Sequence, residues 1–196
     1  NRREFERRLS NAIEISTSSH RQFALCYLDL DEFKVVNDTC GHAVGDQLLQ
    51  SVATRLVACV RDTDTVFRQG GDEFVVLLES IAGPDDAAVV ADKILASMKQ
   101  PIRLPEHEQY ITCSIGISIY PRDGTDRATL LRHADLAMYQ VKAQGRNACA
   151  FFAGRLGTRP LDHVSLENDL HKALANGELD IHYQPQVLLE SGQPVG

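Results

Sequence analysis

The sequence has no tryptophan, only two methionines and no hydrophobic run of membrane-spanning length. A transmembrane helix needs about 20 consecutive apolar residues, so the sequence predicts none. The amino terminus also lacks the basic and apolar segments of a secretory signal peptide. These absences indicate a cytoplasmic location for this stretch of chain.

The cysteines form neither a disulfide framework nor a metal-binding pattern. Five are present, an odd number, and no two stand in a Cys-x-x-Cys pair. We interpret them as reduced thiols, several of them in the core, which is typical of a cytoplasmic protein.

The charge balance is acidic, with a formal net charge of −7 and no basic run. Duplex DNA or RNA is held by clustered lysine and arginine, so no nucleic-acid partner is expected. A single nucleotide is not excluded, because a metal ion and a few cations can hold its phosphates. The 196 residues, 43% of them hydrophobic, suffice for one full domain and a remainder.

The chain is organised around the stretch Gly70-Gly71-Asp72-Glu73, which separates two apolar runs. These runs, residues 65–68 and 74–78, are predicted strands, and the two glycines between them a hairpin turn. Asp72 and Glu73 then lie at a sheet edge, where adjacent acids repel each other and a divalent cation would compensate them. A solvated hairpin that happens to be acidic is the alternative.

A second acidic stretch follows a buried strand predicted over residues 23–29. If this strand pairs beside the hairpin, Asp29 and Asp72 converge, and two carboxylates with backbone oxygens suit Mg²⁺. Next, residues 31–38 are predicted as a short helix or turn with Asp31 as its N-cap. The N–H groups of residues 32–34 would then be free to hold an anion, with Lys34 adding charge or simply lying in solvent.

Five motifs in a fixed order carry a resemblance to a known family. They are Asn1-Arg2-Arg3-x-Phe5, Asp29-x-Asp31-x-Phe33-Lys34-x-x-Asn37-Asp38, Gly41-His42-x-x-Gly45-Asp46, Arg68-x-Gly70-Gly71-Asp72-Glu73-Phe74 and Lys142-x-x-Gly145-Arg146-Asn147. Over residues 1 to about 152 the chain resembles a GGDEF domain, the diguanylate cyclase family. The tail, with Leu166-Glu167-x-x-Leu170 and Tyr183-Gln184-Pro185-Gln186, resembles the opening of an EAL domain, the cyclic di-GMP phosphodiesterase family.

The resemblance implies a GGDEF domain over residues 1–152, a linker over 153–160 and a truncated EAL start over 161–196. The expected fold is α+β, a mostly antiparallel five-stranded sheet flanked by helices, like the palm of nucleotidyl cyclases and polymerases. The tail would contribute a helix and a strand of a βα barrel. A complete barrel takes about 250 residues, so no phosphodiesterase activity is expected from this fragment. An upstream sensory or membrane segment and the rest of the EAL domain are expected in the full-length protein.

By resemblance, the domain condenses two GTP molecules into cyclic di-GMP and releases pyrophosphate. Asp29, the Leu30 carbonyl and Asp72 would hold Mg²⁺ or Mn²⁺, and Glu73 would ligate metal or take the proton of the attacking hydroxyl. Each protomer seats one GTP, so turnover implies a homodimer. The alternative is a silent GTP- or cyclic di-GMP-binding module that regulates a downstream phosphodiesterase.

Guanine presents the N1–H and N2–H₂ donors on one edge, which a carboxylate can accept and which adenine lacks. By resemblance, Asn37 and Asp46 form the guanine-reading pair, and His42 is a further substrate contact. The alternative for Asp46 is a favourable interaction with the dipole of the helix predicted over residues 43–60.

The resemblance implies further substrate contacts, two of them with the phosphates of GTP. Lys142 and Arg146 would bind the β- and γ-phosphates, although both could instead neutralise a helix C-terminal dipole. The others are Phe33, Lys34, Gly70 and Gly71.

Arg61 and Asp64 stand just before the predicted hairpin. In the family, Arg-x-x-Asp at this separation from the signature is the inhibitory product site. The alternative is an ordinary surface salt pair.

Periodicity predicts the remaining elements. Helices are expected over residues 2–17, 84–99 (Ala88, Ala91, Ile94, Leu95 and Met98 inward), 126–144 with Gly145 as C-cap, and 161–176. Strands are expected near Ile102, pairing with a one-sided strand over 109–119, and over 148–152 and 179–187.

Overall fold

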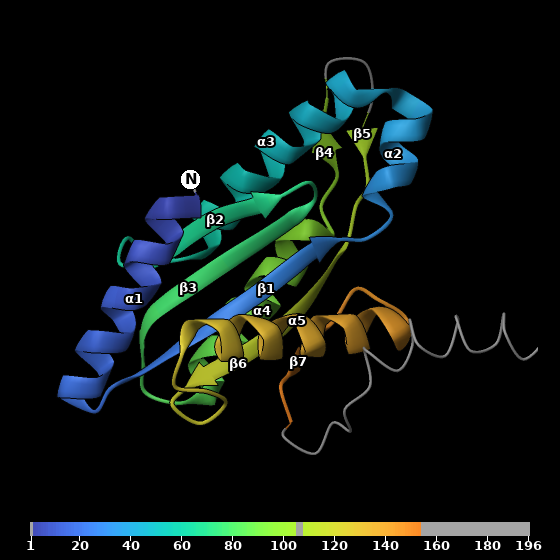
Figure 1. Cartoon of the computed structure of the whole chain (residues 1–196). Helices are drawn as coiled ribbons and strands as arrows, with labels where there is room; N and C mark the ends of the chain where they lie inside the picture. Colours follow the sequence, from blue (N-terminus) through green and yellow to red (C-terminus); the bar gives the residue numbers. More distant parts are fainter. Residues whose placement is uncertain (1, 105–107, 154–196) are drawn as a thin grey trace, which may run out of the picture. The chain divides into compact units, whose positions relative to one another are not determined.

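The computed structural model describes residues 2–104 and 108–153 (Figure 1). The chain divides into two units, Asn1–Leu156 and Gly157–Gly196, and the described residues all lie in the first. The predicted linker beyond residue 153, the tail helix and the tail strand lie outside the described residues. Those boundaries stay predictions.

A five-stranded sheet forms the centre of the domain, in the order β2-β3-β1-β6-β7. Every neighbouring pair is antiparallel except β6 and β7, which run parallel. The strands are β1 (Gln22–Leu30), β2 (Thr65–Gly70), β3 (Glu73–Ile81), β6 (Cys113–Tyr120) and β7 (Cys149–Phe151). The predicted α+β architecture with a mostly antiparallel sheet is confirmed.

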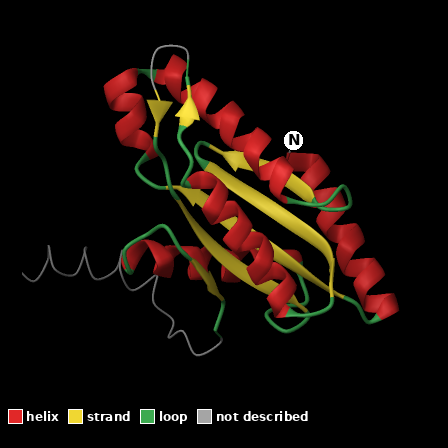
Figure 2. Cartoon of the chain, turned by 180° about the vertical axis from the view of Figure 1, so that it is seen from behind, coloured by secondary structure: helices red, strands yellow, loops and turns green. Residues whose placement is uncertain are grey.

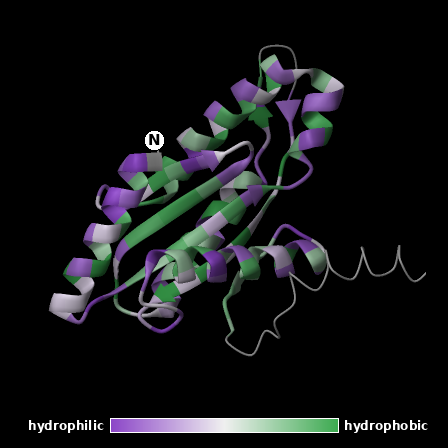
Figure 3. Cartoon of the chain, viewed as in Figure 1, coloured by the Kyte–Doolittle hydropathy of each residue, from purple (hydrophilic) through white to green (hydrophobic). Residues whose placement is uncertain are grey.

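The described residues form five helices, α1 (Arg2–Ser19), α2 (Phe33–Cys40), α3 (His42–Cys59), α4 (Pro84–Met98) and α5 (Arg127–Ala143). Four of them cover the two faces of the sheet, whereas α2 packs against α3 beyond the end of β1 (Figures 1 and 2). Alternation along β1 assigns the faces, because successive side chains of a strand point to opposite sides. Ala24, Cys26 and Leu28 share a core with α2, α3 and α4, whereas Phe23, Leu25 and Tyr27 share one with α1 and α5. The strands are accordingly coloured largely as hydrophobic in Figure 3.

The prediction of a one-sided strand for β6 is wrong, because all eight of its residues are buried. Its small positions face α5 at close range. A Cβ built on Gly116 would lie 1.9 Å from the Ala134 carbonyl oxygen, and the Ser118 hydroxyl donates to the Leu130 carbonyl at 2.9 Å. The small and polar residues that alternate with apolar ones along β6 therefore indicate close packing against a helix, and not exposure to solvent.

The predicted pairing of the strand near Ile102 with residues 109–119 is confirmed at Gln109, but these residues do not form one strand, because β6 begins at Cys113 and belongs to the five-stranded sheet. β4 (Ile102–Arg103) pairs only with β5 (Glu108–Gln109), in a separate two-stranded sheet. In α4, Ala87 is fully buried and Ala88 only partly, so the inward face is turned slightly from the predicted stripe.

All five cysteines are free thiols, and Cys26, Cys59 and Cys113 are buried. The prediction that several of them lie in the core is therefore confirmed. Among the described helices, none combines the length and apolar character that crossing a bilayer requires.

Candidate active site at the ends of β1 and the β2–β3 hairpin

The hairpin turn lies one residue later than predicted. Gly70 is the last residue of β2 and pairs with Glu73, so Gly71 and Asp72 form the turn. Gly71 has a φ of +50°, which glycine adopts readily. The Arg68 Nε donates to the Gly71 carbonyl at 2.9 Å and fixes the turn from the side.

As predicted, the sheet brings the backbones of the two acidic stretches side by side. Asp29 stands opposite Glu73 in the β1–β3 ladder, and the Leu30 N–H donates to the Asp72 carbonyl at 3.3 Å. Within the described residues, no three side chains of histidine, cysteine, aspartate or glutamate are grouped as a metal cluster. The predicted metal site has fewer such side chains than this, because its donors are the carboxylates of Asp29 and Asp72 and the Leu30 carbonyl oxygen.

Lys142 reaches this edge from the last turn of α5. Its ammonium lies 2.7 Å from Asp29 Oδ1, and its side chain is 31% exposed against 10% for Asp29. Burial raises the pKa of Asp29 above its ordinary value, the Lys142 ammonium works in the opposite direction, and the charges of Asp72 and Glu73 raise the pKa further. The lysine therefore does more than neutralise a helix end.

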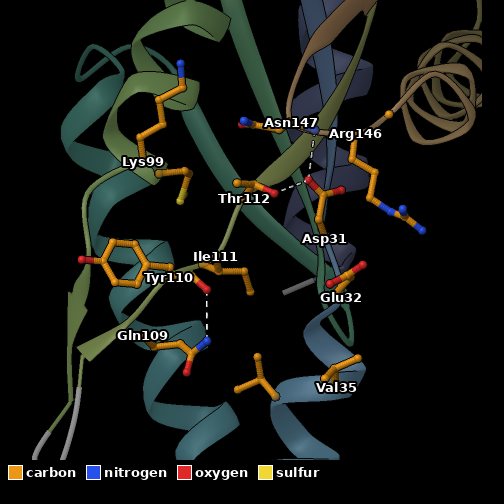
Figure 4. Close-up of a pocket in the computed structure, with 13 residues that line it drawn as sticks. Asp31, Glu32, Val35, Lys99, Gln109, Tyr110, Ile111, Thr112, Arg146 and Asn147 are labelled. Atoms are coloured by element: carbon orange, nitrogen blue, oxygen red, sulfur yellow. Dashed lines mark hydrogen bonds between the residues drawn. The ribbon is translucent and has the colours of Figure 1, made fainter.

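Arg146 lies in the turn after α5. The C-cap of this helix is Gln144 and not Gly145, and three consecutive residues after it have positive φ. They are Gly145 (119°), Arg146 (62°) and Asn147 (49°). Arg146 is exposed and lines a cavity of about 530 Å³ between α2, the end of α4 and the segment around Tyr110 (Figure 4).

The prediction that Asp31 caps α2 is wrong. The N-cap is Glu32, in the left-handed region with φ 59°, and no side chain caps this end. Asp31 instead turns its buried carboxylate toward β6 and the turn after α5, because donors on both lie within reach. The donors are Thr112 Oγ1 at 2.6 Å, Ser114 Oγ at 2.7 Å and the Asn147 N–H at 3.1 Å. Beyond Asp31, Phe33 is buried and Lys34 exposed.

The two predicted guanine-reading residues are brought together where α2 meets α3. Asn37 packs on Gly45, since a Cβ there would lie 1.9 Å from Asn37 Oδ1. Asp46 follows directly and is exposed, lining a groove of about 390 Å³ with residues of α3, β2 and β3. His42 is the first residue of α3 and is exposed. Glycine at position 45 is what permits the contact.

Arg61 and Asp64 form a turn between α3 and β2. The Asp64 carboxylate accepts the Arg61 backbone N–H at 3.0 Å, and the Asp64 N–H donates to the Arg61 carbonyl at 3.0 Å. Asp64 thus binds the backbone of Arg61, and the side chain of Arg61 is exposed. The turn, and not a side-chain salt pair, is what links the two residues.

Comparison with known proteins gives the family of the chain. Residues 1–148 match the family described as "Diguanylate cyclase, GGDEF domain". The chain is 44% identical over 196 residues to the "Bifunctional diguanylate cyclase/cyclic di-GMP phosphodiesterase MucR" of Pseudomonas aeruginosa, covering all of this chain and 28% of the relative. It is 41% identical over 170 residues to the "Cyclic di-GMP phosphodiesterase NbdA" of the same organism, covering 87% of this chain and 22% of the relative.

Among solved structures, the GGDEF domain of TpbB (YfiN) from Pseudomonas aeruginosa superposes with a TM-score of 0.77 at 42% identity. The match covers 78% of this chain and 96% of that domain. The chain spans only about a quarter of the length of these two curated relatives. The alignment with MucR includes the tail, which agrees with the predicted start of an EAL domain.

Proposed function

Because the chain belongs to the GGDEF family of diguanylate cyclases, we propose that it condenses two GTP molecules into cyclic di-GMP and releases two pyrophosphates. One observation supports this most strongly. The hairpin acids Asp72 and Glu73 lie beside the end of β1, where Lys142 contacts Asp29. Acids and a cation at an accessible sheet edge suit phosphoryl transfer, in which catalysis is mainly positioning and charge neutralisation.

Mg²⁺ or Mn²⁺ would be held by Asp29, the Leu30 carbonyl and Asp72. The residues fit such an ion, because all three donors are hard oxygens and Asp29 is a buried carboxylate whose pKa is raised by burial and by the charges of Asp72 and Glu73. When bound, the metal acidifies the ribose 3′-hydroxyl and neutralises charge on the phosphates. Glu73, opposite Asp29, would ligate metal or accept the hydroxyl proton.

The protein's own side chains would orient the nucleotide. Asp46 would accept hydrogen bonds from the guanine N1–H and N2–H₂ groups, and Asn37 could both donate and accept, at the point where α2 packs on α3. Lys142 and Arg146 would hold the β- and γ-phosphates, since they lie on the last turn of α5 and just after it. The remaining proposed contacts are Phe33, Lys34, His42, Gly70 and Gly71.

The product contains two guanylates, so two half-sites must face each other. The 3′-hydroxyl of each GTP attacks the α-phosphorus of the other, and pyrophosphate leaves from each. A homodimer across the exposed hairpin, with one GTP per protomer, satisfies this requirement.

The test is incubation of the chain with GTP and Mg²⁺, followed by chromatography of the products. The proposal expects cyclic di-GMP and pyrophosphate in a ratio of one to two. GTP that is bound but recovered intact would contradict it.

A second candidate is a GTP-binding module without turnover. NbdA is 41% identical to this chain, yet its name gives only phosphodiesterase activity. In this candidate the same pocket binds GTP and regulates the neighbouring EAL domain. Intact GTP in the incubation, together with calorimetric binding, would favour it over the cyclase.

A further inference from the structure

The carboxylate of Asp31 joins three segments that are far apart in the sequence. It is buried, with 7% of the residue exposed, and accepts hydrogen bonds from Thr112 and Ser114 on or beside β6 and from the Asn147 N–H after α5. Its own N–H donates to the Thr112 carbonyl at 2.9 Å. Figure 4 shows Asp31 lying between Thr112 and the backbone of Arg146 and Asn147.

The segment held by Asp31 has an unfavourable backbone. Gly145, Arg146 and Asn147 all have positive φ, a region that residues with a Cβ avoid unless other contacts stabilise it. Within the turn, the Arg146 N–H donates to the Val141 carbonyl at 3.0 Å. The Asn147 bond to Asp31 ties the turn to the end of β1. The conformation of Arg146 therefore depends on a carboxylate outside its own loop.

The position of Asp31 links two proposed binding regions. It follows Asp29 by two residues and Leu30 by one, and the N–H that it accepts belongs to the residue after Arg146. We propose that Asp31 is a positioning residue that sets the separation between the metal edge of β1 and the Arg146 guanidinium. Resting on the proposed function, this inference makes Asp31 a determinant of affinity for the β- and γ-phosphates without any contact to nucleotide.

The experiment compares a triphosphate with a monophosphate. We would measure by calorimetry the affinities for 3′-deoxy-GTP and 3′-deoxy-GMP, which lack the attacking hydroxyl, with Mg²⁺ present. Asp31→Ala is expected to weaken 3′-deoxy-GTP binding about tenfold, the lower end for loss of a ligand-orienting partner. It should change 3′-deoxy-GMP binding less than about twofold, because the base contacts on α2 and α3 remain.

A double-mutant cycle with Arg146→Ala separates positioning from general destabilisation. If Asp31 acts through Arg146, the double variant binds 3′-deoxy-GTP no more weakly than Arg146→Ala alone. Asp123→Ala is the matched control, because Asp123 is also buried and accepts a backbone N–H, from Ile119 near the other end of β6. It should lower stability and leave the preference for triphosphate unchanged.

Asp31→Asn is the conservative variant. Its amide oxygen can still accept from Thr112 and Asn147, and its NH₂ can donate to the Ser114 hydroxyl, so most of the 3′-deoxy-GTP affinity should return. Should Asp31→Ala fail to fold, Asp31→Glu, which displaces the carboxylate by one methylene, must show the same selective loss.

Three outcomes would overturn the inference. They are wild-type triphosphate affinity in a folded Asp31→Ala, equal losses for the triphosphate and the monophosphate, and additive losses in the cycle. The proposed function fails separately. If the wild type makes no cyclic di-GMP but the cycle is non-additive, the positioning role stands and the cyclase does not.

Discussion

Asp29 is a carboxylate in an environment that disfavours its charge. Burial is the main cause of its raised pKa, and the one contacting ammonium, that of Lys142, does not offset burial together with the charges of Asp72 and Glu73. The ionised form that a metal requires thus weakens the fold when no metal is present. An acidic residue whose charge lowers the stability of the fold is typical of a binding site.

This environment predicts that Asp29→Asn raises the melting temperature at neutral pH. Because the pKa is raised in the folded state, protonation of Asp29 contributes stability that is present below the unfolded pKa and is lost as the pH rises through the folded pKa. The difference between variant and wild type should therefore shrink as melts are taken from neutral into acid buffer.

Asp126→Asn is the control of opposite sign. Its hydrogen bond with Thr129 at the start of α5 lowers the pKa of Asp126, so its charge favours the folded state. A melting temperature for Asp29→Asn that is lower than wild type at neutral pH would contradict the account of this site.

Base recognition gives a second prediction at a single residue. Asp46→Ala should cost about 1–3 kcal/mol of GTP affinity, the range for a bidentate contact to a base, and should reduce discrimination against ATP. Gln50→Ala is the control, because Gln50 lines the same groove one turn further along α3. Calorimetry that shows unchanged GTP affinity for Asp46→Ala would remove this residue from the guanine pocket.

Not every residue contact could be predicted from the sequence. The Gly-Gly-Asp-Glu stretch and the apolar run before Asp29 predicted two acidic segments at one sheet edge, because strand patterns are local. The partners of Asp31 lie 81, 83 and 116 residues away, and a helix N-cap was the nearest local role for an aspartate at that point. The contact of Lys142 with Asp29 likewise arises only once α5 lies against the sheet.

At the scale of elements, the errors concern faces and pairing. Alternating polarity predicted solvent on one side of β6, yet α5 covers that side because Gly116 and Ser118 are small enough for helix backbone to approach. The shift of the hairpin turn has a local cause, an irregularity in the ladder between Arg68 and Gly70. The order and type of the main elements needed only periodicity.

The close contact of β6 and α5 predicts the effect of adding one methyl group. In Gly116→Ala the new Cβ would lie within 2.2 Å of backbone atoms of Ala134 and Met138, so α5 must move. Overpacking of this kind costs typically about 1–3 kcal/mol, measurable by urea unfolding. Gly83→Ala has open space around its Cβ and is the control. Equal unfolding midpoints for the two variants would contradict the packing described.

The turn between α3 and β2 carries the proposed inhibitory site. Arg61→Ala should relieve inhibition by added cyclic di-GMP and leave the initial rate nearly unchanged, because Arg61 is exposed on a turn that precedes β2 and the site acids follow that strand. Steady-state rates with increasing product would show it. A wild type that cyclic di-GMP does not inhibit would reduce this motif to a structural turn.

At the scale of the whole molecule, the five family motifs, which occur in a fixed order, predicted more of the fold than hydrophobic periodicity could. They predicted the five-stranded sheet, whereas the placement of α2 against α3 and of α5 against β6 came from packing. The chain covers about a quarter of the length of MucR and NbdA. The requirement for two facing half-sites predicts a rate that rises more steeply than linearly with enzyme concentration while dimers are scarce.

The most direct test of the cyclase site is cyclic di-GMP formation by Asp72→Asn. The change keeps the size of the turn residue and removes the charge at the position between Gly71 and Glu73. Asp92→Asn, at an exposed position of α4, is the matched control. With GTP and Mg²⁺, we expect no product from Asp72→Asn and wild-type product from Asp92→Asn. Equal product from both variants would contradict the assignment of the hairpin acids as the catalytic site.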